Sequence, residues 1–392
     1  MFDSLYIAWK YILFHKWKTA ILVAVISLTF YLPAGVEALV DETTRQLRLR
    51  ASETPLLIGA KGSEAELVLN SLYFDTKPPA EMTMAAKQRV RTSGYAEAIP
   101  LYVRFRTRDK PIVGTTLEYF AFRELEIKSG RQFAILGECV IGAEIASEFG
   151  VAPGDSMLSQ SENIFDLAGV YPLKMKVVGV LRASGTPDDT AVFVDLKTAW
   201  IIAGLGHGHQ DLAQEETADS LLKKEGNLLT ANASVQTYTE ITEQNAASFH
   251  FHGNPNTFPV TAIVALPHDR RSKTLLVGKF QSAGEELQIV QPTETMERLL
   301  ASIIRVRTFV LAGSILLGTA TVLSVFLVFA LSLRIRGQEI ATMRKIGIAS
   351  RRLVLIIVWE ILLVVVSGGV IAMVLALLTR RFSAEAIQWF LL

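Results

Sequence analysis

Long uninterrupted apolar runs flank a central region in which apolar and polar positions alternate over short distances. Three of these runs, at residues 19–40, 306–333 and 353–379, exceed the ~20 mostly apolar residues that a helix needs to cross a bilayer. The first run is longer than the apolar core of a signal peptide, and no convincing small-x-small cleavage site follows it. We therefore predict three transmembrane helices, with residues 380–392 as a short tail on the outer side.

Residues 1–18 mix aromatic and basic side chains, a composition typical of a helix that lies in the membrane interface. These side chains are Tyr6, Trp9, Lys10, Tyr11, Phe14, His15, Lys16, Trp17 and Lys18. We expect a cytoplasmic interfacial helix here that leads directly into the first span.

Between residues 41 and 305, short runs with the period of a strand alternate with helical patterns. The predicted strands cover residues 56–58, 98–105, 111–114, 139–141, 173–181, 191–194, 259–266 and 287–290, and the predicted helices cover residues 79–93, 143–149 and 196–203. Thr293 is a good N-cap residue, so we expect a helix that starts there and runs into the second span. The expected fold class is α+β: transmembrane helices plus a large extracytoplasmic domain, residues 41–305, on a stalk of two helices.

Residues 204–256 differ from the rest of this region, since they are rich in Gly, Asn, Gln, Glu and Ala and poor in large apolar side chains. The interval is too long for an ordinary loop, and we interpret it as a mobile insertion. It holds four of the six histidines, as two His-x-His pairs: His207 with His209, and His250 with His252. Residues two apart in an extended chain point the same way, so each pair can offer two imidazoles to one zinc ion. The alternative is that histidine is simply tolerated on a solvated loop.

A short basic segment, residues 334–352, separates the second and third apolar runs. Its basic residues are Arg334, Arg336, Arg344, Lys345, Arg351 and Arg352. Short loops rich in Lys and Arg stay in the cytoplasm, whereas long translocated domains are exempt from this charge rule. The orientation that follows places residues 334–352 in the cytoplasm and residues 41–305 outside it.

Within this basic segment, an apolar stripe recurs with helical spacing between charged positions. The residues concerned are Arg336, Glu339, Ile340, Met343, Arg344 and Gly347. A segment that only faced lipid headgroups would not need an apolar stripe, so we expect a short helix that docks on another protein. A topology anchor with no other role is the alternative.

The third apolar run carries one acidic residue and a glycine pair. A charge at the position of Glu360, about two turns into the span, costs a few kcal/mol unless it is paired. We expect Glu360 to pair with a cation near the cytoplasmic edge or to lie in a dimer interface, the alternative being a carboxyl that reaches the headgroups. Gly368 and Gly369 permit close helix contact, as in an assembly of two permeases, the alternative being ordinary helix flexibility.

Composition and motifs exclude several classes of function. The chain is 50% hydrophobic yet 20% charged, which fits a membrane protein with a large water-exposed part, and its net charge of +1 gives no electrostatic case for nucleic acid. The single Cys139 excludes an intramolecular disulfide and a metal site made only of cysteine. The sequence has no Walker A motif, no His-Glu-x-x-His, no G-x-S-x-G and no recognisable pair of catalytic carboxylates, so we expect no enzymatic activity in this chain.

The whole pattern resembles the permease subunits of the MacB/FtsX/LolCE class of ABC transporters, the mechanotransmission type. The segment from Arg336 to Gly347 is similar to the cytoplasmic coupling segment of that class, and the entry from Ala8 to Thr19 resembles its interfacial helix. In the central region the resemblance to a MacB-like periplasmic core domain is carried by Gly130-Arg131, Gly154-Asp155, Val177-Val178-Gly179-Val180 and Val192-Phe193-Val194. It covers nearly the whole chain except residues 204–256, although the family usually has four spans and this sequence shows three.

The resemblance implies a role in the bacterial inner membrane. A separate cytoplasmic ATPase would bind ATP and Mg²⁺, the coupling segment would transmit its motion, and the periplasmic domain would export, extract or release a cargo. A second permease copy, identical or related, and a periplasmic adaptor or binding protein are the further partners implied. Two alternatives remain open: a zinc-linked transport system, and an FtsX-like scaffold that regulates a periplasmic partner without transport.

Overall fold

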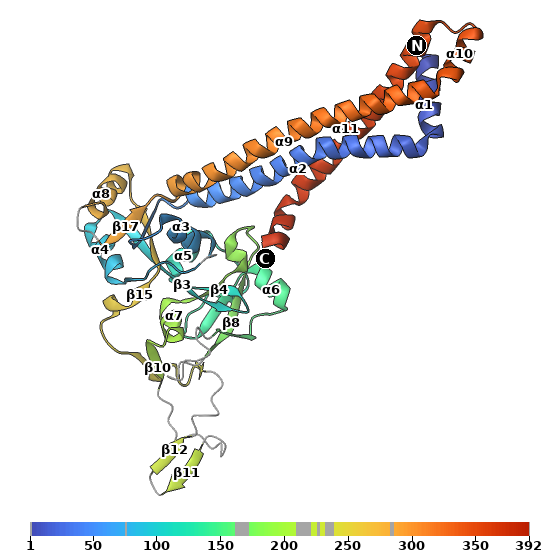
Figure 1. Ribbon diagram of the computed structural model, residues 1–392. Coiled ribbons are helices and arrows are strands. Elements are labelled where there is room, and N and C mark those ends of the chain that lie inside the picture. The colour runs from blue at the N-terminus through green and yellow to red at the C-terminus, as the bar shows by residue number, and fades with distance from the viewer. Residues whose placement is uncertain are drawn as a thin grey trace. The chain divides into compact units, whose positions relative to one another are not determined.

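The computed structural model describes residues 2–74, 77–160, 172–208, 221–225, 228–231, 239–282 and 286–391. Its contacts divide the chain into two compact units. The first, here called the helical unit, combines residues 1–49 with residues 297–392. The second, the α+β unit, comprises residues 50–296. Figure 1 shows the elements of both units.

The helical unit is built from five helices, two of which begin or end in the other unit. They are α1 (Phe2–Phe14), α2 (Lys16–Ser52), α9 (Pro292–Ile335), α10 (Gly337–Lys345) and α11 (Ser350–Leu391). Three stretches are long and apolar enough to cross a membrane: Lys16–Ala38, Thr308–Ile335 and Ser350–Arg381. α11 continues past Arg381 to Leu391, so the predicted tail of residues 380–392 is helical as far as the structure describes it.

A small cluster of apolar side chains packs the three long helices of this unit together. Leu22 and Ile26 of α2 pack with Phe329 of α9 and Val364 of α11. A Cβ on Gly368 would lie 2.6 Å from the Ile26 side chain, so a glycine there lets α11 approach α2 within the same chain. A Cβ on the neighbouring Gly369 would meet nothing within 4 Å.

The α+β unit is organised around a mixed sheet of eleven strands. The main path runs β13 (Thr239–Glu240), β8 (Leu173–Leu181), β6 (Glu138–Ile141), β9 (Val192–Asp195), β4 (Lys110–Thr115), β3 (Ala96–Thr107), β16 (Ala262–Pro267), β1 (Leu56–Ala60) and β17 (Leu287–Val290). The strands β5 (Ile127–Gly130) and β7 (Ser156–Leu158) pair with β8 off this path. The α+β fold class predicted from the sequence is confirmed.

Six α-helices and three small two-stranded sheets complete the described part of this unit. The helices are α3 (Glu64–Tyr73), α4 (Ala85–Ser93), α5 (Leu117–Phe122), α6 (Ala143–Phe149), α7 (Leu196–Ile202) and α8 (Arg270–Phe280). The small sheets pair β2 (Met82–Thr83) with β15 (Pro259–Val260), β10 (Gly206–Gly208) with β14 (Phe249–Phe251), and β11 (Leu221–Glu225) with β12 (Leu228–Ala231).

Some local predictions differ from the structure for identifiable physical reasons. Thr293 does not cap α9, because the helix already begins at Pro292, and the Thr293 hydroxyl donates instead to the Ala51 carbonyl at 3.3 Å. The strand predicted at residues 259–266 is divided at Thr261. Its hydroxyl accepts a hydrogen bond from the Val103 amide and donates one to the Leu101 carbonyl, which also accepts from the Thr261 amide at 2.9 Å. The Val103 amide therefore pairs with a side chain here instead of with a backbone carbonyl.

Candidate functional site

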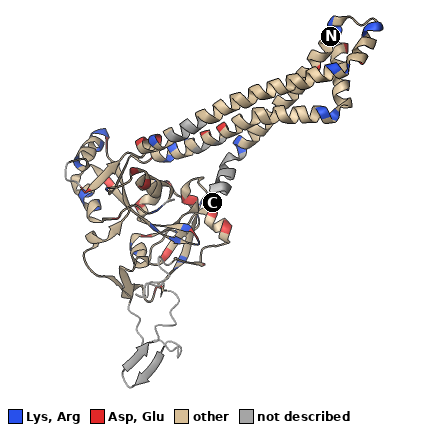
Figure 2. Ribbon diagram, in the orientation of Figure 1, with Lys and Arg blue, Asp and Glu red and all other residues tan. Residues whose placement is uncertain are grey.

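The basic segment, residues 334–352, contains α10 and the turns on either side of it. Figure 2 shows Lys and Arg residues gathered at the end of the helical unit where α1 and α10 lie. On α10, Glu339 and Arg344 are exposed, whereas Ile340 and Met343 are half-buried. Gly347 lies beyond the last helical residue, in a turn, with φ of +95°. It is therefore not part of the helix face on which the sequence placed it, and it supplies the left-handed turn between α10 and α11.

Arg336 connects this segment to three helices. Its guanidinium donates to Glu360 of α11 at 3.1 Å and lies 3.4 Å from Glu339 of α10. The same group stacks over the ring of Tyr11 in α1, with its central carbon 3.6 Å from the ring centroid. A planar guanidinium can stack and form ion pairs at once, which an ammonium does less well.

Glu360 is the acceptor at the centre of this arrangement. Its side chain is almost fully buried, and its second oxygen lies 3.6 Å from the ammonium of Lys18 in α2. Lys18 in turn donates to the Ser332 hydroxyl of α9 at 2.7 Å. Of the interpretations that the sequence left open, the structure therefore shows pairing with cations of the same chain. The four residues Tyr11, Lys18, Arg336 and Glu360 are called the cytoplasmic ion cluster below.

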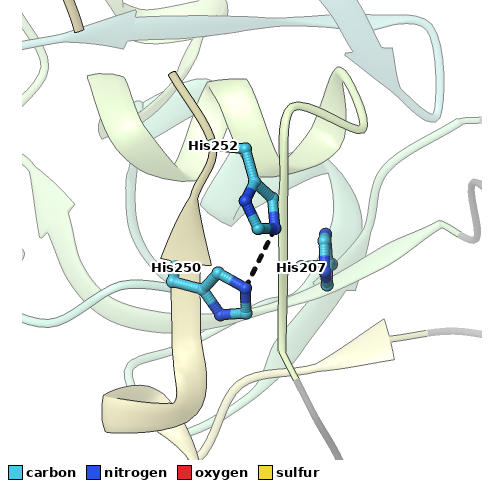
Figure 3. Close-up of side chains that lie close together, drawn as sticks. All are labelled: His207, His250 and His252. Atoms are coloured by element: carbon cyan, nitrogen blue, oxygen red, sulfur yellow. Dashed lines mark hydrogen bonds between the residues drawn. The ribbon is translucent and has the colours of Figure 1, made fainter. Parts of the chain in front are cut away.

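A second group of side chains lies in the α+β unit, where His207, His250 and His252 come together (Figure 3). His207 is in β10 and faces His250 of β14 directly across the antiparallel pair. The potential ligand nitrogens of the three rings all lie within 4.8 Å of one another. The three are called the histidine cluster below. His209, the fourth residue of the predicted set, lies outside the described residues.

The backbone of the histidine cluster is fixed by aromatic packing on the other face of the strands. A Cβ on Gly206 would lie 2.6 Å from the Phe251 ring, and one on Gly208 would lie 2.6 Å from the Phe249 ring. Only glycine lets these rings cover β10 so closely. Phe251 also contacts Trp200 of α7, with ring centroids 6.3 Å apart. The glycines on either side of His207 are therefore needed for the packing that holds it opposite His250.

A third group was not predicted from the sequence: a buried ion pair between Arg50, in the last turn of α2, and Asp188. Arg50 forms two hydrogen bonds to the Asp188 carboxylate and a third to the Leu72 carbonyl, the latter at 3.1 Å. The Tyr119 hydroxyl donates to Asp188 at 3.0 Å. Burial disfavours the charged form of Asp188, yet the Arg50 guanidinium outweighs it and holds the pKa of Asp188 below its ordinary value. Burial first, then the Asp188 charge, raises the pKa of Tyr119 to about 12, so its hydroxyl stays protonated.

A comparison with known protein families identifies the family of this chain. The family described as the MacB-like periplasmic core domain matches residues 19–248, more than half of the 392 residues. The chain belongs to this family. It is a membrane protein of the ABC permease type, and its large α+β unit is the periplasmic domain. The match includes most of residues 204–256, which the sequence analysis had set apart from the resemblance.

Two solved structures are similar to the periplasmic domain at low identity. The extracellular domain of the noncanonic ABC-type transporter YknZ from Gram-positive bacteria is 12% identical with a TM-score of 0.33, covering 60% of this chain and 98% of its own. The periplasmic region of MacB from Actinobacillus actinomycetemcomitans is 11% identical with a TM-score of 0.34, covering 63% of this chain and 92% of its own. At this similarity neither adds to the family assignment. No curated protein gives a significant match.

Proposed function

We propose that this chain is the permease subunit that couples a separate cytoplasmic ATPase to work done by its own periplasmic domain. The observation that carries the proposal is the position of Arg336, at the start of α10, between Glu360 of α11 and Tyr11 of α1. A displacement of α10 cannot occur without breaking these contacts or moving α1 and α11 with it. A charge pair buried at a membrane helix resists separation, because each charge left alone is costly there.

The exposed charges of α10 supply the contact surface for the ATPase. Glu339 and Arg344 are both exposed, although one Glu339 oxygen also lies 3.4 Å from Arg336. Oppositely charged groups on a partner can pair with both of them, and such pairs set the orientation of docking as well as its rate. The partner proposed here binds ATP and Mg²⁺, which this sequence has no Walker A motif to hold.

The continuous helix α2 offers the route towards the periplasmic side. It runs without a break from Lys16, next to the cytoplasmic ion cluster, to Ser52. Its last turn carries Arg50, which is bonded to Asp188 inside the periplasmic domain. Motion passed along α2 needs firm attachment at the periplasmic end of the helix, and the buried ion pair of Arg50 with Asp188 provides it. In this scheme the cargo is extracted, exported or released on the periplasmic side, by an assembly that includes a second permease copy.

The double variant Glu339→Ala/Arg344→Ala tests the contact with the ATPase. We expect at least about tenfold less stimulation of ATP turnover by the permease, since loss of two interfacial charge contacts weakens binding by ~1.4 kcal/mol or more. Both side chains are exposed, so the variant should still insert and fold. The measurement is the ATP hydrolysis rate of the reconstituted complex in vesicles. The control is Arg182→Ala with Glu126→Ala, an exposed pair in the periplasmic domain. Normal stimulation by the α10 variant would remove these two residues from the contact.

A further inference from the structure

The histidine cluster combines two features that a metal site needs: a fixed backbone and several nitrogen ligands on one face. His250 lies in β14 and His252 directly follows that strand, so the two are two residues apart and point to the same side, opposite to Phe249 and Phe251. The aromatic side packs on Gly206, Gly208 and Trp200. The imidazole side is more accessible, because His207 and His252 are exposed and His250 is half-buried.

One hydrogen bond selects the tautomer of His250 whose Nε2 lone pair is available to a metal ion. Its Nδ1 atom lies 3.1 Å from the Ser248 carbonyl, which can only accept, so Nδ1 carries the proton. The Nε2 atom of the neutral ring is then a lone-pair acceptor that faces the other two imidazoles. Histidines that bind metals characteristically donate their second ring N–H to a carbonyl or carboxylate in this way.

The distances within the cluster are close to those of a coordination sphere. The Nε2 atoms of His250 and His252 are 3.1 Å apart (Figure 3). Two nitrogens bound to one tetrahedral zinc ion at 2.0–2.1 Å lie roughly 3.3 Å apart. All three ligand nitrogens lie within 4.8 Å of one another, so the widest pair has to close by roughly 1.5 Å at most to reach that spacing.

The nature of the ligands decides which ions the site can take. Among the described residues, the cluster consists of imidazoles alone. Imidazole suits Zn²⁺, Cu²⁺ and Ni²⁺, whereas Mg²⁺ and Ca²⁺ prefer oxygen ligands. The described residues supply three ligands, and a tetrahedral zinc ion takes a fourth: water or substrate in catalytic sites, a further side chain in structural ones.

We propose that His207, His250 and His252 form a site for a divalent transition metal, of the Zn²⁺ class, on the periplasmic domain. The site holds its ion through these three imidazole nitrogens, and a fourth ligand, water or a further side chain, completes the tetrahedron. This role does not require the proposed contact with the ATPase, and the two fail separately: the metal site lies in the periplasmic domain, and α10 does not contribute to it.

The test is titration of the metal-free full-length protein with ZnCl₂ in detergent, followed by calorimetry and by competition with a chromophoric chelator. Wild type should bind one ion in the presence of the competitor. The double variant His250→Gln/His252→Gln should lose this binding by on the order of 100-fold or more, since removal of ligands costs at least as much as removal of their supporting partners. The same decrease is expected for His207→Ala.

Two controls separate ligation from folding and from weak binding to any histidine. His268→Ala removes an exposed histidine that is not in the cluster and should leave zinc affinity unchanged. Thermal unfolding without metal should be the same for wild type and for the glutamine variant, because both replaced side chains are partly or fully exposed. With saturating zinc, only wild type and His268→Ala should gain thermal stability. The proposed site would be wrong if all variants bound zinc with equal affinity. It would also be wrong if His268→Ala lost as much affinity as the cluster variants, since the binding would then be adventitious.

Discussion

Replacement of Asp188 by asparagine is expected to destabilise the periplasmic domain by about 3–5 kcal/mol, since it leaves the buried Arg50 charge without its counterion. The amide can accept only through one oxygen, while the carboxylate accepts from Arg50, Tyr119 and Thr186. Chemical unfolding followed by fluorescence should show the midpoint shifted to lower denaturant. The control is Glu97→Gln, the same carboxyl-to-amide change at an exposed position, which should alter stability by no more than ~0.5 kcal/mol.

The ion pair of Arg50 with Asp188 also predicts that the free energy of unfolding of the periplasmic domain decreases at low pH. The pKa of Asp188 is lower in the folded than in the unfolded chain, so at low pH the unfolded chain binds the extra proton. The contribution of ionised Asp188 to stability is complete above the ordinary aspartate pKa of about 3.9. It is lost as the pH falls through the lower pKa of the folded state. The difference in unfolding free energy between wild type and Asp188→Asn should therefore shrink below about pH 4. A difference independent of pH across that range would mean that Asp188 is not held ionised by Arg50.

Replacement of Glu360 by alanine is expected to have an effect of similar size on the helical unit, about 3–5 kcal/mol. It leaves Arg336 and Lys18 facing each other without the carboxylate that lies between them. The repulsion should release Arg336 from α11, so that ATP turnover in the reconstituted complex no longer drives the periplasmic domain. Thermal unfolding in detergent measures the loss of stability. The ATP-dependent change in reactivity of an engineered cysteine in the periplasmic domain measures the loss of coupling.

The double variant Arg336→Met/Glu360→Met separates loss of packing from loss of charge pairing. Replacement of both partners by apolar groups of similar size is far less costly than removal of one. We expect the double variant to regain most of the thermal stability lost in Glu360→Met alone, without regaining coupling. If Glu360→Met is as stable as wild type, the ion pair is not what holds α10 to α11.

The elements most accessible from the sequence were those whose signal is local. The apolar runs led to the three spans because helices in a bilayer must be apolar along their whole length. The buried strands β3, β8 and β9 show up as runs of β-branched and aromatic residues. By contrast, α8 was missed because its sequence is mostly polar and only Leu276 and Phe280 are buried. Its Asp269 N-cap, which accepts from the Ser272 amide at 2.6 Å, was the signal available.

The sites depend on contacts between distant parts of the chain, which no local pattern contains. Arg50 and Asp188 are 138 positions apart, and neither stands out by its neighbours. The two His-x-His pairs were visible, but the sequence could not show that His207 lies in register with His250. That register depends on the fit of Phe249 and Phe251 over two glycines, a packing effect that appears only once the strands are paired. Glu360 was recognised as costly, and its partners Lys18 and Arg336 became evident only in the structure.

Site-specific photo-cross-linking from the basic segment, residues 334–352, tests the proposed coupling to an ATPase most directly. A photoreactive amino acid in place of Ile346, whose side chain is 77% exposed in the turn after α10, should capture a protein that carries a Walker A motif, identified by mass spectrometry. The same amino acid in place of Leu158, exposed in the periplasmic domain, should not. The proposed coupling predicts that the photoreactive residue at position 346, and not the one at position 158, forms an adduct with the ATPase. Capture of the ATPase from position 158, or its absence from position 346 in cells that produce both proteins, would contradict the account.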